Sequence, residues 1–298
     1  MDLLATTQTL ILRDIKVLHL EPTDVCQAAC VLCARETDTN FDQSQQHHLS
    51  MYQILNTFGA DNIEMLDKMF MCGNYGDPAA GKHTMNIYRQ FRKINSDIVL
   101  GMNTNGALRT PQWWRELANI LCQPRDYVVF SIDGLEDTNH LYRKNVKWSR
   151  LIDNVKAFIE AGGSAHWDML VYRHNQDQVS ACEQLARDLG FKWFRAKVSK
   201  RGFVHDLQQP IGWYVPKVTS SQIQCHALGE QSLYIDAQAR VSPCCWLGAT
   251  QHNFVTDFEQ VQQSWHTDHV NPICASTCAV QHTGTSFTNQ WQREVELC

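Results

Sequence analysis

The sequence predicts an α/β protein: a partial TIM-like (β/α)6 barrel followed by a small, cysteine-rich extension with a β-hairpin and a helix. Three observations predict this fold class. Short β-rich runs alternate with longer stretches of helical period, the alternation stops near residue 200, and six of the twelve cysteines lie beyond that point. We expect a barrel core over residues 1–205 and the extension over residues 206–298.

Six β-rich runs mark the strands of the predicted barrel. They are Ile15–Leu20, Lys68–Cys72, Ile98–Asn103, Tyr127–Ile132, His166–Tyr172 and Phe191–Val198. Repeated strand and helix units imply parallel strands with right-handed crossovers. Because six repeats are too few to close an eight-stranded barrel, we expect an open one, with its chemistry on the loops that follow the strands.

Between these runs, apolar residues recur three or four positions apart, as in amphipathic helices. The predicted helices are Met51–Phe58, Thr84–Ile94, Trp113–Leu121, Ser149–Ala161 and Gln178–Leu189. Helix-end signals agree with them: Ser50 and Thr110 are expected N-caps, Pro111 suits a first turn, and Gly162 and Gly190 can end helices in the left-handed conformation.

The tail and one long loop complete the predicted elements. Leu233–Ile235 and Arg240–Val241 flank a turn as a short hairpin, and Thr256–His266 is a candidate helix. The polar stretch Asp38–His48 is expected to be an exposed loop. Cys122 and Cys182 fall in predicted helices and are expected in the core.

Composition narrows the class of protein. The chain has 298 residues, 44% of them hydrophobic and 19% charged, which excludes disordered and fibrous classes. The net charge of -5 provides no basic field for nucleic acid. No apolar run approaches the ~20 residues of a membrane span, and the N-terminus lacks a basic segment followed by a cleavage site. We therefore expect a cytoplasmic protein without a nucleic-acid or membrane partner.

Cysteines 26, 30 and 33 follow the first predicted strand as a C-x3-C-x2-C triplet. Three thiolates on one short loop suit an iron–sulfur cubane, and three ligands leave one iron open. A zinc site wants four ligands, and no fourth is evident nearby. With these residues the chain resembles the radical S-adenosylmethionine (SAM) superfamily over roughly residues 10–200.

This resemblance implies the cofactors and the chemistry. A [4Fe–4S] cluster on Cys26, Cys30 and Cys33 would bind SAM through its open iron and donate the electron that cleaves SAM to a 5′-deoxyadenosyl radical, which abstracts a hydrogen atom from the substrate. A reductant such as flavodoxin or ferredoxin is the implied partner.

Four more motifs follow in the order of the family. Residues 72–78 lie where the family has its Gly-Gly-Glu-Pro loop, 103–106 and 131–134 are similar to its Thr-Asn-Gly and Ser-Leu-Asp-Gly segments, and 140–143 to its His-x-x-Arg. The residues that the resemblance assigns to SAM are Gly73, Asn74, Tyr75, Gly76, Asp77, Asn103, Ser131, Asp133 and Arg143. A surface salt bridge is the alternative for Arg143. Asp77 stands for the usual Glu, which leaves its hydrogen-bond partner open, and Leu32 replaces an aromatic residue.

The segment from Ala239 to Cys244 resembles the hairpin of the SPASM and Twitch extensions, which carry auxiliary iron–sulfur clusters. The tail lacks the full SPASM set, so the resemblance implies one Twitch-like auxiliary [4Fe–4S] cluster on Cys225, Cys244, Cys274 and Cys278. Zinc on the same thiolates and plain core cysteines are the alternatives. Cys245 can replace Cys244, because neighbouring strand residues point to opposite faces. Cys298 is either an inert terminal thiol, a ligand or a hydrogen-atom donor.

Taken together, these features predict a radical SAM enzyme of the oxidoreductase type that modifies a peptide by cross-linking, oxidation or epimerisation. Dehydrogenation of a small polar metabolite is the alternative reaction. An iron–sulfur protein for electron transfer or sensing is the alternative without catalysis, and the SAM-loop motifs argue against it.

Overall fold

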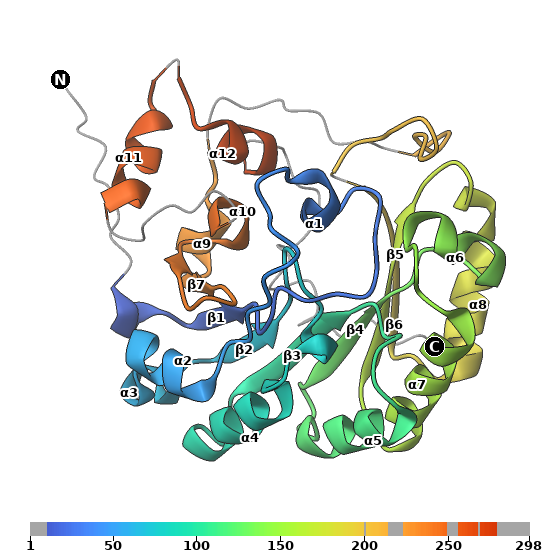
Figure 1. Ribbon diagram of the computed structural model, residues 1–298, viewed down its shortest axis with the longest axis horizontal. Helices are drawn as coiled ribbons and strands as arrows, with labels where there is room; N and C mark the ends of the chain where they lie inside the picture. Colours follow the sequence, from blue (N-terminus) through green and yellow to red (C-terminus); the bar gives the residue numbers. More distant parts are fainter. Residues whose placement is uncertain (1–10, 200, 214–222, 249–255, 268, 279–298) are drawn as a thin grey trace.

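An open eight-stranded sheet forms the centre of the computed structural model, which describes residues 11–199, 201–213, 223–248, 256–267 and 269–278 (Figure 1). The strands are β1 (Val17–Leu20), β2 (Lys68–Met71), β3 (Val99–Thr104), β4 (Tyr127–Ser131), β5 (Ala165–Val171), β6 (Trp193–Val198), β7 (Ser232–Ile235) and β8 (Val241–Ser242). Their order in the sheet is β6-β5-β4-β3-β2-β1-β7-β8.

Helices connect these strands, and some of them cover one side of the sheet. They are α1 (Ala34–Thr37), α2 (Met51–Phe58), α3 (Ala60–Glu64), α4 (Thr84–Ile94), α5 (Pro111–Ile120), α6 (Glu136–Tyr142), α7 (Trp148–Glu160), α8 (Val179–Leu189), α9 (His226–Gly229), α10 (Cys245–Gly248), α11 (Thr256–Ser264) and α12 (Pro272–Thr277). Short 3-10 turns lie at Leu12–Asp14, Pro78–Ala80 and Gln176–Gln178. Figure 1 shows α4, α5, α7 and α8 along one side of the strands and α9 to α12 grouped beside β7.

The predicted partial barrel is confirmed. Strands β1 to β6 are all parallel and lie in chain order, and the sheet does not close. The hairpin in the tail is present as β7 and β8, and β7 also pairs in parallel with β1, so that Leu20 stands opposite Ile235. The first strand of the tail therefore extends the barrel sheet.

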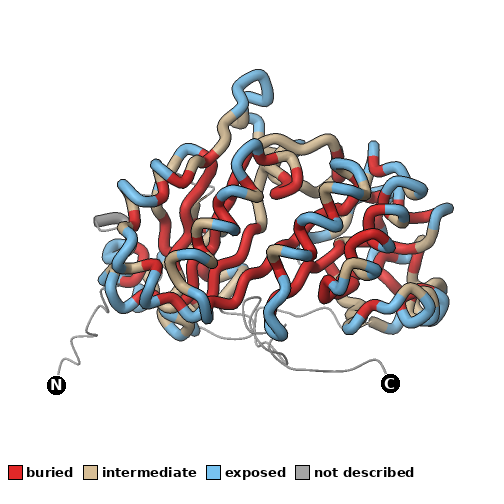
Figure 2. Tube along the Cα trace, turned by 90° about the horizontal axis from the view of Figure 1, so that it is seen from below, coloured by how far each residue is buried: buried red, intermediate tan, exposed pale blue. Residues whose placement is uncertain are grey.

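The two sides of the sheet differ in chemistry, because successive strand residues point to opposite faces. The face toward the helices, here called the outer face, carries buried apolar residues such as Leu100, Phe130 and Trp167. The opposite face, here called the inner face, carries His19, stacked on Phe70 at 4.3 Å between ring centroids, together with polar and charged residues described below. Figure 2 shows the buried stretches in the interior of the molecule, with exposed turns around them.

Local signals set most helix ends. Ser50 caps α2 in a capping box with Gln53, and Gly190 ends α8 in the left-handed conformation at φ 84°, as predicted. Thr110 precedes α5 as expected, but its side chain makes no capping hydrogen bond. Cys182 is buried in α8, whereas the expectation for Cys122 was wrong: α5 ends at Ile120, which leaves Cys122 exposed beyond it.

Among the residues that the structure describes, no helix combines the length and the apolar character that a membrane crossing needs.

Candidate functional site

Loops that follow β1, β2, β3 and β4 meet at one edge of the sheet, because the carboxyl ends of parallel strands share an edge. The loop after β1 contains Cys26, Cys30 and Cys33, and Cys33 is the residue before α1. The predicted SAM segments occupy the loops after β2, β3 and β4. The residues of the cysteine triplet and of the predicted SAM segments therefore lie together at one edge of the sheet.

The three thiols of the triplet each have polar neighbours. Cys26 Sγ accepts from the Ala28 backbone N–H at 3.4 Å and lies 3.7 Å from Asn105 Nδ2. Cys30 Sγ lies 4.0 Å from the guanidinium of Arg143, and Cys33 Sγ donates to the Asn74 carbonyl oxygen at 3.5 Å. Donors and cations beside sulfur stabilise thiolates and tune iron–sulfur centres. This donor set fits the ligands of a cluster.

Without a metal, the environment favours protonated thiols. Burial raises the pKa of Cys30 to about 11, although the nearby Arg143 opposes the shift. Burial also raises the pKa of Cys26, and the neighbouring Asp77 adds to the increase. Metal coordination deprotonates a thiol outright, so bound iron would reverse this preference.

The loop after β2 packs tightly against the loop after β1. A Cβ on Gly76 would collide with the Thr23 carbonyl oxygen, and one on Gly73 with the Gly76 carbonyl oxygen. The backbone N–H groups of Tyr75 and Gly76 donate to Glu21 Oε1 at 2.7 and 3.0 Å. Glu21 is buried, and its burial raises the pKa of the carboxyl to about 7 against the hydrogen bonds that it accepts.

The family resemblance assigns two side chains of this loop to SAM, but both have hydrogen-bond partners within the protein. Asn74 Nδ2 donates to the Cys245 carbonyl oxygen at 2.7 Å and to Tyr234 Oη at 3.3 Å. Tyr75 Oη donates to Asp38 Oδ2 at 2.8 Å, and its ring stacks on Phe41 at 4.3 Å between centroids. Both side chains therefore link the loop to other segments.

Asp77 ends this loop and links it to the next one. Its buried carboxylate accepts from Thr104 Oγ1 at 2.8 Å, and from the backbone N–H and side-chain Nδ2 of Asn105 at 2.8 and 2.7 Å. The Ala79 backbone N–H also donates to it at 2.9 Å. These contacts provide the partners that the sequence left open for the shorter side chain.

Asp133 and Arg143 form a buried ion pair, with Arg143 Nε 2.7 Å from Asp133 Oδ2. The Leu170 backbone N–H donates to Asp133 Oδ1 at 2.6 Å. Burial raises the pKa of Asp133, while the guanidinium of Arg143 opposes the shift. Arg143 thus connects the loop after β4 to Cys30, and the ion pair is an interior one rather than the surface contact that the sequence left open.

A charged row crosses the inner face beside these loops. Ser131 stands opposite Asp168, which stands opposite Arg195. Asp168 accepts from Arg195 Nε at 2.8 Å and from Lys197 Nζ at 2.6 Å. Burial opposes ionisation of Asp168, but the charges of Lys197 and Arg195 outweigh it and lower its pKa to about 2. On the same face, the Asn103 side-chain oxygen is buried and has no hydrogen-bond partner among the described residues.

Sequence reasoning missed several residues of this site. Asp168, Arg195 and Lys197 had a usable signal, because they are charged residues at alternate positions of otherwise apolar strand runs. Glu21 and Tyr234 had none, since they meet across 213 positions of sequence.

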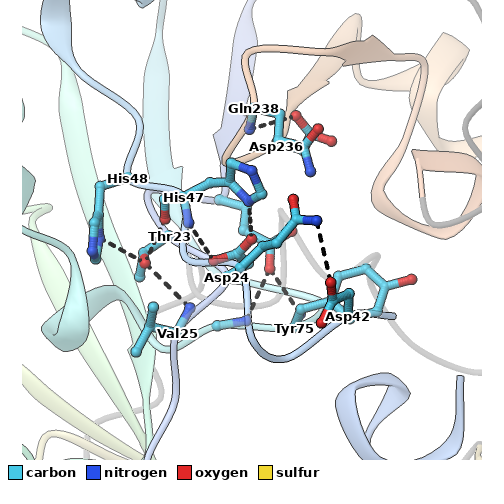
Figure 3. Close-up of polar contacts among 12 residues, drawn as sticks. Thr23, Asp24, Val25, Asp42, His47, His48, Tyr75, Asp236 and Gln238 are labelled. Atoms are coloured by element: carbon cyan, nitrogen blue, oxygen red, sulfur yellow. Dashed lines mark hydrogen bonds and ion pairs between the residues drawn. The ribbon is translucent and has the colours of Figure 1, made fainter. Parts of the chain in front are cut away.

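The loop at residues 38–48 borders the site and is held to the segment that precedes Cys26. Asp24 accepts from the His47 backbone N–H at 2.8 Å and lies 2.6 Å from His47 Nδ1, while Thr23 Oγ1 contacts His48 Nδ1 at 2.9 Å (Figure 3). The Arg35 guanidinium donates to the Asp24 carbonyl oxygen at 2.5 Å. The two histidines of this loop therefore have structural partners in the segment that precedes Cys26.

The tail cysteines lie near one another around α9, α10 and α12. Burial raises the pKa of Cys225 and Cys244 to about 12, and electrostatic repulsion from Cys278 contributes in both cases. Cys274 is buried in α12. Cys245 begins α10, and burial raises the pKa of its thiol, with repulsion from Cys244 and from Cys72 after β2 adding to the shift. Cys298 lies outside the described residues.

Neither set of cysteines is arranged around a single metal ion. Across the described parts of the chain, no three His, Cys, Asp or Glu side chains are placed to hold one ion. Ligands of a cubane bind different irons and need not converge on one point.

Solved structures similar to this chain share its fold. SuiB of Streptococcus suis bound to SAM has a TM-score of 0.56 and 14% identity over 85% of this chain and 66% of that one. SuiB bound to its precursor peptide SuiA gives a TM-score of 0.56 and 16% identity over 87% and 65% of the two chains. Native anSMEcpe with bound SAM gives 0.56 and 12% over 77% and 74%.

Sequence comparisons identify the family. The tungsten-containing aldehyde ferredoxin oxidoreductase cofactor-modifying protein of Pyrococcus furiosus is 31% identical over 120 residues, which are 40% of this chain and 31% of that protein. This chain therefore spans about a third of the curated relative that it matches. The family model described as Radical SAM superfamily matches residues 20–186, more than half of the chain. Members of this superfamily are enzymes that use SAM and a [4Fe–4S] cluster, and the chain described here belongs to it.

Proposed function

We propose that this protein is a radical SAM enzyme that modifies a peptide, with its [4Fe–4S] cluster on Cys26, Cys30 and Cys33. The observation that carries the proposal is the position of these three thiols on one loop, at the edge where the strands end, with Arg143 beside Cys30. The family match over residues 20–186 supports the same position for the cofactors.

A reduced cluster held by Cys26, Cys30 and Cys33 would supply the one-electron cleavage of SAM, and with it the radical chemistry for hydrogen abstraction from the substrate. The protein's residues hold and orient these groups. Asn105 and Arg143 bring donors to Cys26 and Cys30. Hydrogen bonds of Glu21 and Asp77 hold the loop after β2. The buried side-chain oxygen of Asn103 on the inner face has no partner within the described part of the chain and is available to bind SAM or substrate.

Peptide modification is favoured over a small metabolite by one comparison. SuiB, which shares the fold, has been solved with its precursor peptide SuiA. We infer the same class of substrate here, with cross-linking, oxidation or epimerisation as the outcome, in the cytoplasm and with flavodoxin or ferredoxin as reductant. The cofactor-modifying relative from Pyrococcus furiosus keeps a small-molecule substrate as the second candidate.

We further infer one Twitch-like auxiliary [4Fe–4S] cluster on Cys225, Cys244, Cys274 and Cys278. The charge interactions of Cys225 with Cys274 and Cys278, and of Cys244 with Cys225 and Cys278, support it, because they indicate that the four thiols lie near one another. Cys245 stays the alternative to Cys244, because its buried thiol interacts with Cys244 as well as with Cys72 and Glu21 at the barrel.

Iron and sulfide analysis of the Cys26/Cys30/Cys33→Ala variant, reconstituted without oxygen and zinc, tests this inference. About four irons per chain should remain on the tail. Iron near zero would refute the auxiliary cluster.

The radical SAM chemistry is tested by the release of 5′-deoxyadenosine. The reconstituted and reduced wild type should release it from SAM, and the Cys26/Cys30/Cys33→Ala variant should release none. Cys182→Ala is the matched control, because it removes a buried thiol in α8. A wild type that holds its clusters but leaves SAM intact would favour the electron-transfer alternative.

The substrate class is tested with short peptides encoded beside the gene and with small polar metabolites. A peptide substrate should accelerate 5′-deoxyadenosine release and lose hydrogen, or exchange one hydrogen with D₂O if it is epimerised. If only a metabolite accelerated the release of 5′-deoxyadenosine, the peptide substrate would be rejected in favour of a small-molecule substrate.

A further inference from the structure

Glu21 is the centre of a buried hydrogen-bond network that joins three distant segments. It follows β1 directly and has 1% of its surface exposed. Its Oε1 accepts the backbone N–H groups of Tyr75 and Gly76, and its Oε2 accepts the hydroxyl of Tyr234. One carboxylate thus binds both the loop after β2 and the tail strand β7.

Tyr234 extends this network to the other side of the same loop. Its ring is 1% exposed and meets His19 at 4.9 Å between centroids on the inner face. Its hydroxyl also accepts from Asn74 Nδ2 at 3.3 Å, and the same Nδ2 donates to the Cys245 carbonyl oxygen at 2.7 Å. The loop after β2 is therefore bonded to the tail both directly and through Glu21.

These contacts fix the path of the loop. Hydrogen bonds to a carboxylate are stronger than those between neutral groups, and a buried donor that loses its acceptor destabilises the structure that holds it. Packing restricts the loop as well, because a Cβ on Gly73 would come within 2.7 Å of Glu21 Oε1. The Tyr75 and Gly76 amides have their acceptor only while the Glu21 carboxylate keeps its position.

We propose that Glu21 and Tyr234 are positioning residues, through which the C-terminal extension holds the loop after β2 in the shape that binds SAM. This inference rests on the proposed function, since it takes residues 73–77 as part of the SAM site. Glu21 and Tyr234 act through the loop, and the affinity of the barrel for SAM depends in this way on a strand of the tail.

The test compares Tyr234→Phe and Glu21→Gln with a matched control, Tyr88→Phe. Tyr88 is also fully buried, and its hydroxyl donates to the Gly101 carbonyl oxygen at 2.7 Å, away from the loop. All proteins are reconstituted without oxygen and compared at equal iron content. Equilibrium dialysis gives the dissociation constant of SAM, and hydrogen exchange measured by mass spectrometry gives the protection of residues 73–77.

Tyr234→Phe and Glu21→Gln should each weaken SAM binding about fivefold to tenfold and speed exchange of residues 73–77. Tyr88→Phe should lower thermal stability with little change in either readout. If one of the two variants does not fold, the other gives the same test.

Two results would overturn the inference in different ways. Wild-type affinity in both variants, with only stability reduced, would leave Glu21 and Tyr234 as structural residues while the proposed function stands. A fully reconstituted wild type that binds no SAM would refute the proposed function and this inference together.

Discussion

The same strands form both faces of the sheet, but the outer face is packed with apolar side chains and the inner face contains buried ion pairs. On the outer face, Phe130 packs against Trp114, Phe158 and Phe191 with no polar atom among them except the indole nitrogen, which is bonded. The inner face buries Asp168 with two cations instead. Burial of apolar area stabilises the fold, whereas burial of charge costs desolvation energy that the ion pair only partly offsets.

This difference suggests a test that separates stability from the proposed function. Apolar residues on the inner face would stabilise the fold at least as well as an ion pair does. The charged row of Asp168, Arg195 and Lys197 is nevertheless placed beside the loops that carry the candidate cofactor site. Substitutions on the two faces should therefore separate stability from function.

The largest effect is expected from Phe130→Ala on the outer face. Loss of a fully buried aromatic ring leaves a cavity and should lower the free energy of unfolding by about 3–5 kcal/mol. Denaturant unfolding measures this change, and the fraction that remains folded should bind SAM with wild-type affinity. Altered affinity in folded protein would show that the two faces are not separable.

A pH effect of intermediate size is expected from Glu21 on the inner face. Its pKa is about 7 in the folded protein, above the ordinary 4.5 of the unfolded chain. Between these values the folded state binds more protons, so this group lowers stability as pH rises from 4.5 to 7. Relative to wild type, Glu21→Gln should gain about 2–3 kcal/mol between pH 5 and pH 7.5.

Thermal unfolding of both proteins across this pH range measures the gain from Glu21→Gln. The loss of hydrogen bonds in the variant shifts the whole curve but not its slope. A difference between variant and wild type that does not change with pH would contradict the expectation.

The smallest effect on stability is expected from Asp168→Asn. Arg195 and Lys197 lose their charged partner, but about a third of the Lys197 side chain is exposed, and water then solvates it. We expect a loss of about 1–2 kcal/mol, together with a clear fall in the rate of substrate modification.

The control for Asp168→Asn is Glu183→Gln in α8, which removes the carboxylate from the exposed ion pair with Arg187 at 2.8 Å. It should change stability by less than about 0.5 kcal/mol and leave activity unchanged. If Asp168→Asn and Glu183→Gln changed the rate of substrate modification equally, the inner face would have no specific role in the reaction.

Most of the barrel was predictable because its signals are local. The ends of the five predicted helices and six predicted strands agree with the structure to within two residues, since hydrophobic period, caps and glycines act over one or two turns. The convergence of the predicted cofactor loops followed from the parallel order of the strands. The partners of Asp77, Asn74 and Arg143 were not predictable, because each side chain has several donors or acceptors within reach only after the loops have packed.

The sequence by itself determined the open barrel, the loop with Cys26, Cys30 and Cys33, and the family. The reason is that the alternation of strand and helix patterns and the spacing of the cysteines depend on residues that are close together in the chain. Only the tertiary structure decided that β7 extends the barrel sheet and that Tyr234 reaches Glu21. The physical reason is that a strand edge accepts any strand of suitable register, and a buried carboxylate accepts any donor that packing brings to it. Contacts between residues that are far apart in the sequence produce no periodic pattern from which they could be predicted.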